Sequence, residues 1–162
     1  MRPSLTATDE ATRQVAEVTH MSESENVELF RRVTLGAFAD GDMSVIDECL
    51  TDDFQEHEPA PGVRSGREGV KDIVTMIRTG FPDLRITIDE AFGVGDQVCA
   101  RSTWTGTNTG PFMGMAPTGK TATWEAIDII HARDGRIAEH WGQLDVMGML
   151  TQIGLMQMPM AA

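Results

Sequence analysis

The sequence has little of what marks nucleic-acid-binding, membrane-spanning or secreted proteins. Only 13 of its 162 residues are Lys or Arg, against 25 Asp and Glu, so its formal net charge is −12. A surface this acidic repels a phosphate backbone, and we predict no nucleic-acid partner. Its apolar runs are far shorter than a membrane span, and the first 20 residues lack the apolar core of a secretory signal. We therefore predict a soluble cytoplasmic protein with no membrane partner.

Cysteine and histidine are also scarce, with two and four copies. Cys49 and Cys99 match neither a metal-ligand spacing nor a disulfide framework, so we interpret both as small buried side chains in a reducing compartment. No two histidines have the i, i+4 spacing of a metal site on a helix. We therefore predict no metal.

The length and composition of the chain indicate one folded domain. With 162 residues, 41% of them apolar, the chain can bury one core of ordinary size but not two independent cores. We expect a polar leader over residues 1–23, the domain over residues 24–154 and a short tail over residues 155–162.

The first part of the domain carries two helix patterns. Ser22 and Glu25 have capping-box spacing ahead of apolar residues at helical intervals, which predicts an amphipathic helix over residues 25–39. Asp42 can cap a second, short helix over residues 43–50. The segment TDDFQEHEPAPG that follows should be extended, because two prolines close it.

Beyond this segment the pattern changes from helices to strands. Ser65 and Glu68 form a second capping box before a third helix, which should end at the Gly-Phe-Pro of residues 80–82. Apolar and polar residues then alternate with a period of two, as in half-buried strands. Four strands are predicted, one beginning at Leu84 and the others over residues 97–107, 121–131 and 136–144. A short helix over residues 145–154 follows.

This order of elements predicts an α+β fold. Three helices, a four-stranded antiparallel meander and a last helix imply helices packed on one face of a single sheet. We expect a cone-shaped, curved antiparallel sheet wrapped by the three N-terminal helices, with the short helix at its C-terminal end. Such a cone leaves an apolar pocket.

Large apolar side chains are candidates to line this pocket. The loop GPFMGMAPTGK is rich in glycine and proline and contains two methionines, which adapt to irregular surfaces. Core packing is the commoner role of such residues elsewhere in the chain, so the loop has the strongest claim to contact a ligand. The candidate substrate-binding residues of this kind are Phe54, Trp104, Trp124, Phe112, Met113 and Met115.

A carboxylate interrupts one of the apolar strands. Asp128 lies among isoleucines, and a carboxylate is costly to bury without a partner. If Arg133-Asp134-Gly135 forms a three-residue turn, Asp128 lies opposite His140. If Asp134-Gly135 forms a two-residue turn, Asp128 faces Trp141 and His140 points to the other side of the sheet. The turn therefore decides whether the two polar groups meet.

In the first register, two roles are open to Asp128 and His140. They form a catalytic dyad in which one of them removes a proton from a carbon next to a carbonyl, or they form a buried ion pair that fixes the hairpin. His57, in the segment DFQEHEP, is a further candidate at the mouth of the pocket. It either contacts the substrate or relays protons, or it is an ordinary residue of a surface loop.

Five segments resemble the SnoaL-like polyketide cyclases, members of the nuclear transport factor two-like superfamily. They occur in the family's order and are GREGV, FPDLR, GPFMGMAPTG, DGRIAEHW and LTQIG. The resemblance implies a cone of sheet and helices around a hydrophobic cavity. It also implies a homodimer or homotetramer formed through the sheet, and chemistry without a metal or cofactor. In the family, one pocket carboxylate acts as acid and base in the aldol ring closure of a polyketide ester.

The chain departs from the family pattern at the catalytic position. Aligning the Asp-Gly turn places the family's catalytic aspartate on Gly142 and its supporting histidine on Asp128. Asp145 matches an aspartate at the start of the last helix, where it would be the N-cap. The alignment favours the register in which Asp128 meets His140, and Gly142 would widen the cavity beside them.

The sequence contains no tyrosine, which bears on the choice between enzyme classes. Ketosteroid isomerases, scytalone dehydratases and limonene-type epoxide hydrolases resemble this fold and use tyrosine hydroxyls, so their familiar mechanisms are not expected here. A conjugated substrate that delocalises its own charge requires no dedicated oxyanion donor. We therefore predict a cofactor-free acid–base enzyme, of the cyclase or hydroxylase type, that acts on an aromatic polyketide or similar conjugated ketone. The alternatives are a binding protein without turnover, or a hydrolase or dehydratase of a small metabolite.

Overall fold

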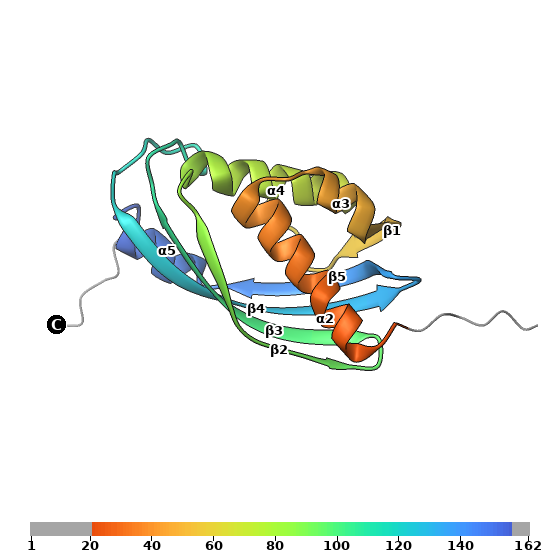
Figure 1. The fold of residues 1–162 in the computed structure, drawn as a ribbon. Helices are drawn as coiled ribbons and strands as arrows, with labels where there is room; N and C mark the ends of the chain where they lie inside the picture. The colour runs from red at the N-terminus through yellow and green to blue at the C-terminus, as the bar shows by residue number, and fades with distance from the viewer. Residues whose placement is uncertain (1–20, 157–162) are drawn as a thin grey trace, which may run out of the picture.

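A curved sheet with helices on one of its faces forms the fold, which confirms the predicted α+β class (Figure 1). The computed structural model describes residues 21–156, so most of the expected leader and tail lies outside the described residues. The helices are α2 (Glu23–Arg31), η1 (Arg32–Asp40), α3 (Ser44–Cys49), α4 (Gly66–Gly80) and α5 (Val146–Gln152). The strands are β1 (Leu50–Glu56), β2 (Arg85–Val94), β3 (Gln97–Thr107), β4 (Thr121–Arg133) and β5 (Arg136–Leu144). No helix among them is long and apolar enough to cross a membrane.

The two predicted capping boxes have different outcomes. At the start of α2, the Glu25 backbone N–H donates to the Ser22 hydroxyl and the Ser22 N–H donates to the Glu25 carboxylate, which confirms the first box. The second box is wrong, because Ser65 occupies the N-cap position of α4 without a side-chain hydrogen bond. The carboxylate of Glu68 instead accepts from Arg64 and Lys71, and these ion pairs hold it away from the cap.

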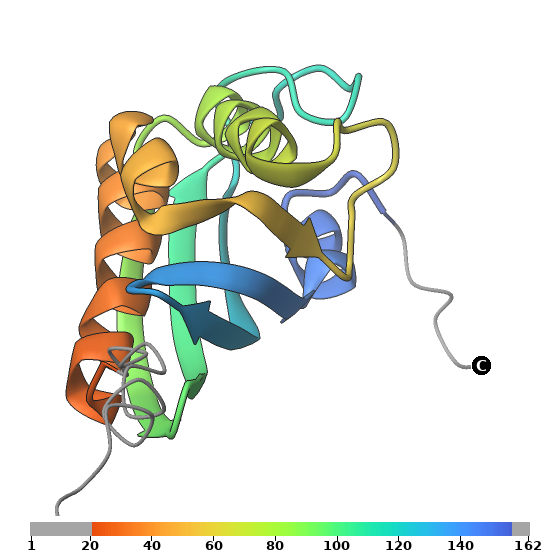
Figure 2. The same cartoon turned by 90° about the vertical axis from the view of Figure 1, so that its right-hand side faces the viewer.

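The sheet has one strand more than the sequence predicted. Residues 50–56, expected only to be extended, form β1 and pair in parallel with β5 at the edge of the sheet. The strand order is β1-β5-β4-β3-β2, and Figure 2 shows β1 (yellow) running beside β5 (blue). A parallel partner about 80 residues away in sequence leaves no local signal, which is why four strands were predicted instead of five.

The hairpin of β4 and β5 adopts neither of the two registers considered. Asp134 and Gly135 both have positive φ, 52° and 76°, as a two-residue type I′ turn requires. Arg133 and Arg136 accordingly face each other across the turn. One residue later the register shifts, because β5 contains an extra residue at a β-bulge.

The bulge returns His140 to the face of the sheet that carries Asp128. Ile137 and Ala138 are consecutive in β5, yet both are buried, which interrupts the alternation of the strand. Beyond the bulge Asp128 lies opposite Gly142, and His140 lies opposite Ile130. Because side chains repeat every two residues, the His140 and Asp128 side chains share one face and are diagonal neighbours.

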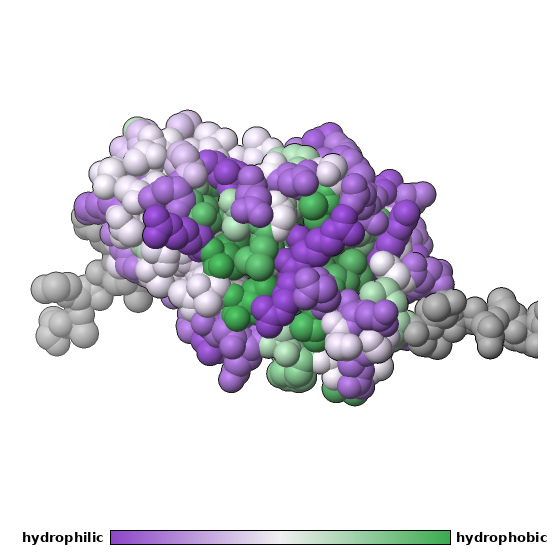
Figure 3. Space-filling view, in the orientation of Figure 1, coloured by the Kyte–Doolittle hydropathy of each residue, from purple (hydrophilic) through white to green (hydrophobic). Residues whose placement is uncertain are grey.

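The helices cover this inner face of the sheet and form the core with it. In Figure 1, α2, α3 and α4 lie on one side of the strands and α5 lies at one end. One apolar cluster joins α2, η1 and α3 to the sheet, and a second gathers around Trp104 and Trp124. In Figure 3, hydrophobic side chains are visible between hydrophilic ones on the side of the molecule that faces the viewer.

We predict that Asp145 stabilises the last helix as its N-cap. Its Oδ1 accepts the Gly148 backbone N–H at 2.8 Å. Asp145→Ala should lower the free energy of unfolding by about 1 kcal/mol in urea titrations, because one N–H at the helix start loses its acceptor. Gln143→Ala, at an exposed position that makes no cap, is the control. Equal losses in the two variants would contradict a capping role.

Candidate active site

Three polar side chains from three strands meet on the inner face of the sheet. Nδ1 of His140 lies 2.7 Å from Oε2 of Glu56, and Nε2 lies 3.1 Å from Oδ1 of Asp128. The side chain of Asp128 is 10% exposed, whereas the side chains of His140 and Glu56 are 24% and 23% exposed. We call these residues the Glu56–His140–Asp128 triad. The structure thus brings together the two residues that the sequence proposed as a dyad and adds a third.

The two carboxylates keep the imidazole of His140 charged. Burial alone would lower its pKa, but the hydrogen bonds to Asp128 and Glu56 outweigh burial and raise the pKa to about 9. At neutral pH both ring nitrogens therefore carry a proton and donate, one to each carboxylate. Within residues 21–156, no group of three or more His, Cys, Asp or Glu side chains has the arrangement of a metal site.

Glu56 was missed in the sequence because β1 was missed. Phe54 is 5% exposed and packs in the core, so the alternation of a strand places Glu56 on the same inner face. The apolar Phe54 two residues earlier was therefore the signal that would have found Glu56. The same alternation directs the next residue, His57, to the opposite side.

His57 lies on the outer face of the sheet, which corrects its expected place at the pocket mouth. Its ring stacks on Trp141 with centroids 4.0 Å apart and planes 2° apart. Its Nε2 is 2.9 Å from Oε2 of Glu139. His131 also packs against Trp141, with ring centroids 4.8 Å apart. The structure therefore separates His57 from the triad by the thickness of the sheet.

We expected Gly142 to widen the cavity beside the dyad. Instead, the imidazole of His140 occupies the space beside Gly142. A Cβ added at Gly142 would lie 2.6 Å from Cε1 of His140 and 3.2 Å from Oδ1 of Asp128. Such contacts are shorter than van der Waals distance, so any side chain at this position would displace the ring. The absence of a side chain at Gly142 is thus what allows His140 to reach Asp128.

The inner face beside Asp128 is lined by small side chains. In the two neighbouring strands, Ala100 and Gly142 lie directly opposite Asp128. Ala126 and Ser102 follow on the same face and are paired with each other. Among the described residues no hydrogen bond reaches Oδ2 of Asp128, so this oxygen is free to accept a proton.

A buried donor without an acceptor lies further along the same face. Trp104 donates its indole N–H to the Ser102 hydroxyl at 2.8 Å. Its cross-strand partner Trp124 is 2% exposed, and its Nε1 has no hydrogen-bond partner in the described part of the chain. A buried indole N–H usually has an acceptor, so the N–H of Trp124 is available to donate a hydrogen bond to an oxygen of a bound molecule.

The remaining candidate residues divide between core and loop. Phe54 and Phe112 are buried, and Met115 is half-buried against the cluster around the two tryptophans. Met113 stands at the tip of its loop, 52% exposed, with a φ of 50° that a long side chain seldom adopts. Their contact with a ligand stays a prediction.

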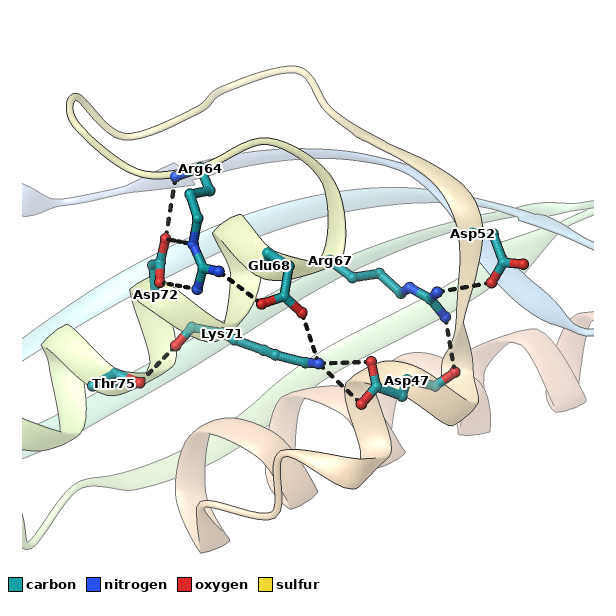
Figure 4. Close-up of polar contacts among 8 residues, drawn as sticks. All are labelled: Asp47, Asp52, Arg64, Arg67, Glu68, Lys71, Asp72 and Thr75. Atoms are coloured by element: carbon teal, nitrogen blue, oxygen red, sulfur yellow. Dashed lines mark hydrogen bonds and ion pairs between the residues drawn. The ribbon is translucent and has the colours of Figure 1, made fainter.

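Ion pairs hold β1 in place from the helical side. Figure 4 shows Arg67 and Lys71 of α4 reaching α3 and β1. Arg67 bonds the Asp52 carboxylate at 2.8 Å, and Lys71 bonds Asp47 at 2.7 Å. Single exposed pairs contribute little, but this network links three elements around the strand that carries Glu56.

The family model for SnoaL-like polyketide cyclases matches residues 28–153. The chain belongs to this family. It is 39% identical over 59 residues to the aklanonic acid methyl ester cyclase AcmA of Streptomyces galilaeus, a match that spans 36% of this chain and 41% of that protein. The match therefore spans less than half of the relative's length.

Two solved structures extend the similarity over most of the chain. TsrD from Streptomyces laurentii superposes with a TM-score of 0.75 at 29% identity, covering 84% of this chain and 99% of that chain. Wild-type IdmH from Streptomyces antibioticus gives a TM-score of 0.70 at 31% identity, covering 80% and 98%. The resemblance found in the five sequence segments is thereby confirmed for the family and for its fold.

We predict that Gly142→Ala breaks the contact between His140 and Asp128. The new methyl group would push the ring away from its two carboxylates, so the pKa of His140 should fall from about 9 toward its ordinary value of 6.5. An NMR titration of the histidine ring protons measures this shift. Gly36→Ala in η1 is the control and should leave the titration unchanged, whereas a pKa that stays near 9 in Gly142→Ala would disprove the steric role of Gly142.

Proposed function

We propose that this protein is an acid–base enzyme of the polyketide cyclase type, in which Asp128 removes a proton from a carbon next to a carbonyl. The protonation of His140 carries this proposal. Both ring nitrogens are engaged as donors, so the imidazolium has no lone pair with which to accept a substrate proton. Asp128 is the buried carboxylate of the triad that has an oxygen left free.

The proposed reaction is an intramolecular aldol closure. Asp128 takes the proton from the acidic carbon, and the electron pair of that C–H bond becomes the enolate. The enolate carbon attacks a ketone of the same molecule, a C–C bond forms and the ketone oxygen becomes an alkoxide. The alkoxide then takes the proton back from Asp128, so the enzyme ends the cycle unchanged. No cofactor takes part in this sequence.

The register of the hairpin supports Asp128 in this role. The resemblance to the family places its catalytic aspartate on Gly142, and Asp128 lies directly opposite Gly142 in the sheet. Side chains of directly opposite residues begin only about 5 Å apart. The carboxylate of Asp128, on the neighbouring strand, can therefore reach the same region of the inner face as a carboxylate at position 142 would.

An aromatic polyketide or a similar conjugated ketone is the substrate class that this site supports best. The similarity to a cyclase named for aklanonic acid methyl ester favours a polycyclic aromatic ester. The small side chains around Asp128 suit a flat ring, and Trp124 offers its N–H to a ring oxygen. We infer that the apolar residues that line the bound molecule are Phe54, Trp104, Phe112, Met113 and Met115.

The first test is Asp128→Asn assayed with aklanonic acid methyl ester. Turnover should fall by about 100-fold or more, because the general base is lost. Binding of the ester, measured by calorimetry, should stay close to wild type because the amide has the same shape. Glu125→Gln changes an exposed carboxylate of the same strand and is the control. Unchanged turnover in Asp128→Asn would disprove the assignment of Asp128 as the general base.

A binding protein without turnover is the second candidate, because Gly142 stands where the family's catalytic aspartate is expected. That function predicts tight binding of the ester and no conversion by the wild-type protein. The same calorimetry and product assay therefore separate the two functions.

The second test concerns the unpartnered indole of Trp124. Trp124→Phe should lower kcat/KM for the ester by about ten-fold, because a hydrogen bond to a substrate oxygen is lost. Trp141→Phe is the control, because it makes the same change in size on the outer face of the sheet, where the ring stacks on His57 and no substrate is proposed to bind. Equal losses in both variants would show that the effect is one of packing.

A further inference from the structure

Glu56 is held at both oxygens of its carboxylate. Oε2 accepts the Nδ1–H of His140 at 2.7 Å, and Oε1 accepts the backbone N–H of Glu58 at 3.1 Å. The carboxylate is therefore oriented by the turn that follows β1 as well as by the imidazole. A side chain with this many contacts has little freedom to rotate.

The end of β1 also contacts β5 on both faces of the sheet. Glu56 lies beside His140 in the parallel pairing, and the His57 backbone N–H donates to the His140 carbonyl at 2.9 Å. On the inner face Glu56 bonds the His140 ring, and on the outer face His57 stacks on Trp141. This double contact fixes the distance between the Glu56 carboxylate and the imidazole.

We propose that Glu56 is a positioning residue of the active site, which holds the imidazole of His140 doubly protonated with Nε2–H directed at Asp128. Asp128, and not His140, is then the group that accepts the substrate proton. The proposal rests on the proposed function for its catalytic consequence. Its structural content, the control of His140 by Glu56, does not depend on any substrate.

The physical basis is the charge balance around one ring. The charged groups that face His140 are Glu56 from β1 and Asp128 from β4, and both stabilise the imidazolium. Without Glu56, only Asp128 would oppose the effect of burial, which lowers the pKa of His140. A neutral ring would then be populated at neutral pH, and Asp128 would lose the positive charge that faces it.

Glu56→Gln tests this role, because the amide keeps the shape of the side chain and removes its charge. In the substrate-free protein, the pKa of His140 followed by NMR should fall from about 9 by about 1 to 2 units. Glu58→Gln is the matched control, because Glu58 contacts Glu56 through its backbone and not through its carboxylate. A His140 pKa that does not move in Glu56→Gln would overturn the proposal.

The dependence of turnover on pH gives a second, independent measurement. Wild-type kcat with the ester should be lost as the pH rises through about 9, where the imidazolium loses its proton. In Glu56→Gln this alkaline limb should move to lower pH by the same 1 to 2 units, which a purely structural role would not produce. An unmoved limb, together with a lowered His140 pKa, would refute the link between Glu56 and the reaction.

The two measurements also separate this inference from the proposed function. If the wild-type protein converts no ester but Glu56→Gln lowers the pKa of His140, the role of Glu56 stands and the enzyme assignment fails. If Glu56→Gln does not fold, Glu56→Asp replaces it, because the shorter side chain cannot keep the 2.7 Å contact with His140. The pKa of His140 should again fall, and an unchanged value would overturn the proposal.

Discussion

The β-bulge in β5 is the constraint on which the site depends. The two-residue turn at Asp134-Gly135, continued without interruption, would direct His140 to the outer face and place Trp141 on the inner face, opposite Asp128. One extra residue, placed where Ile137 and Ala138 are both buried, reverses the alternation for the rest of the strand. Asp128 and His140 then meet, and the outer face receives Trp141. A local irregularity of the backbone therefore decides which chemistry is available in the interior.

Once the ring is on the inner face, the energetics of burial determine its neighbours. A charged imidazole away from water needs opposite charge, and a buried carboxylate needs a donor. The Glu56–His140–Asp128 triad meets both needs with two short hydrogen bonds. It leaves one negative charge in excess, because two carboxylates flank one cation. That excess supports the proposal that a carboxylate, and not the imidazole, accepts the substrate proton.

The parts of this arrangement that could be predicted are those with a local signal. The strand over Gln97–Thr107 and the cap at Asp145 follow from alternation and from side-chain chemistry within a few residues. The parallel pairing of β1 and the bulge have no such signal, because both depend on packing against strands far away in sequence. Glu56 was overlooked, and His57 was expected at the pocket mouth, because β1 had no such signal. Asp128 was found because an aspartate among isoleucines is locally anomalous.

Asp128 and Gly142 are best understood as one feature of the site, because each requires the other. A side chain at Gly142 would collide with the His140 ring, so the triad exists only with glycine there. A glycine at that position removes the carboxylate that the family resemblance places there, and the directly opposite residue is the nearest site from which to restore one. Asp128 occupies that opposite position. In the proposed mechanism the carboxylate therefore comes from β4 instead of β5, and the His140 ring occupies the space beside Gly142.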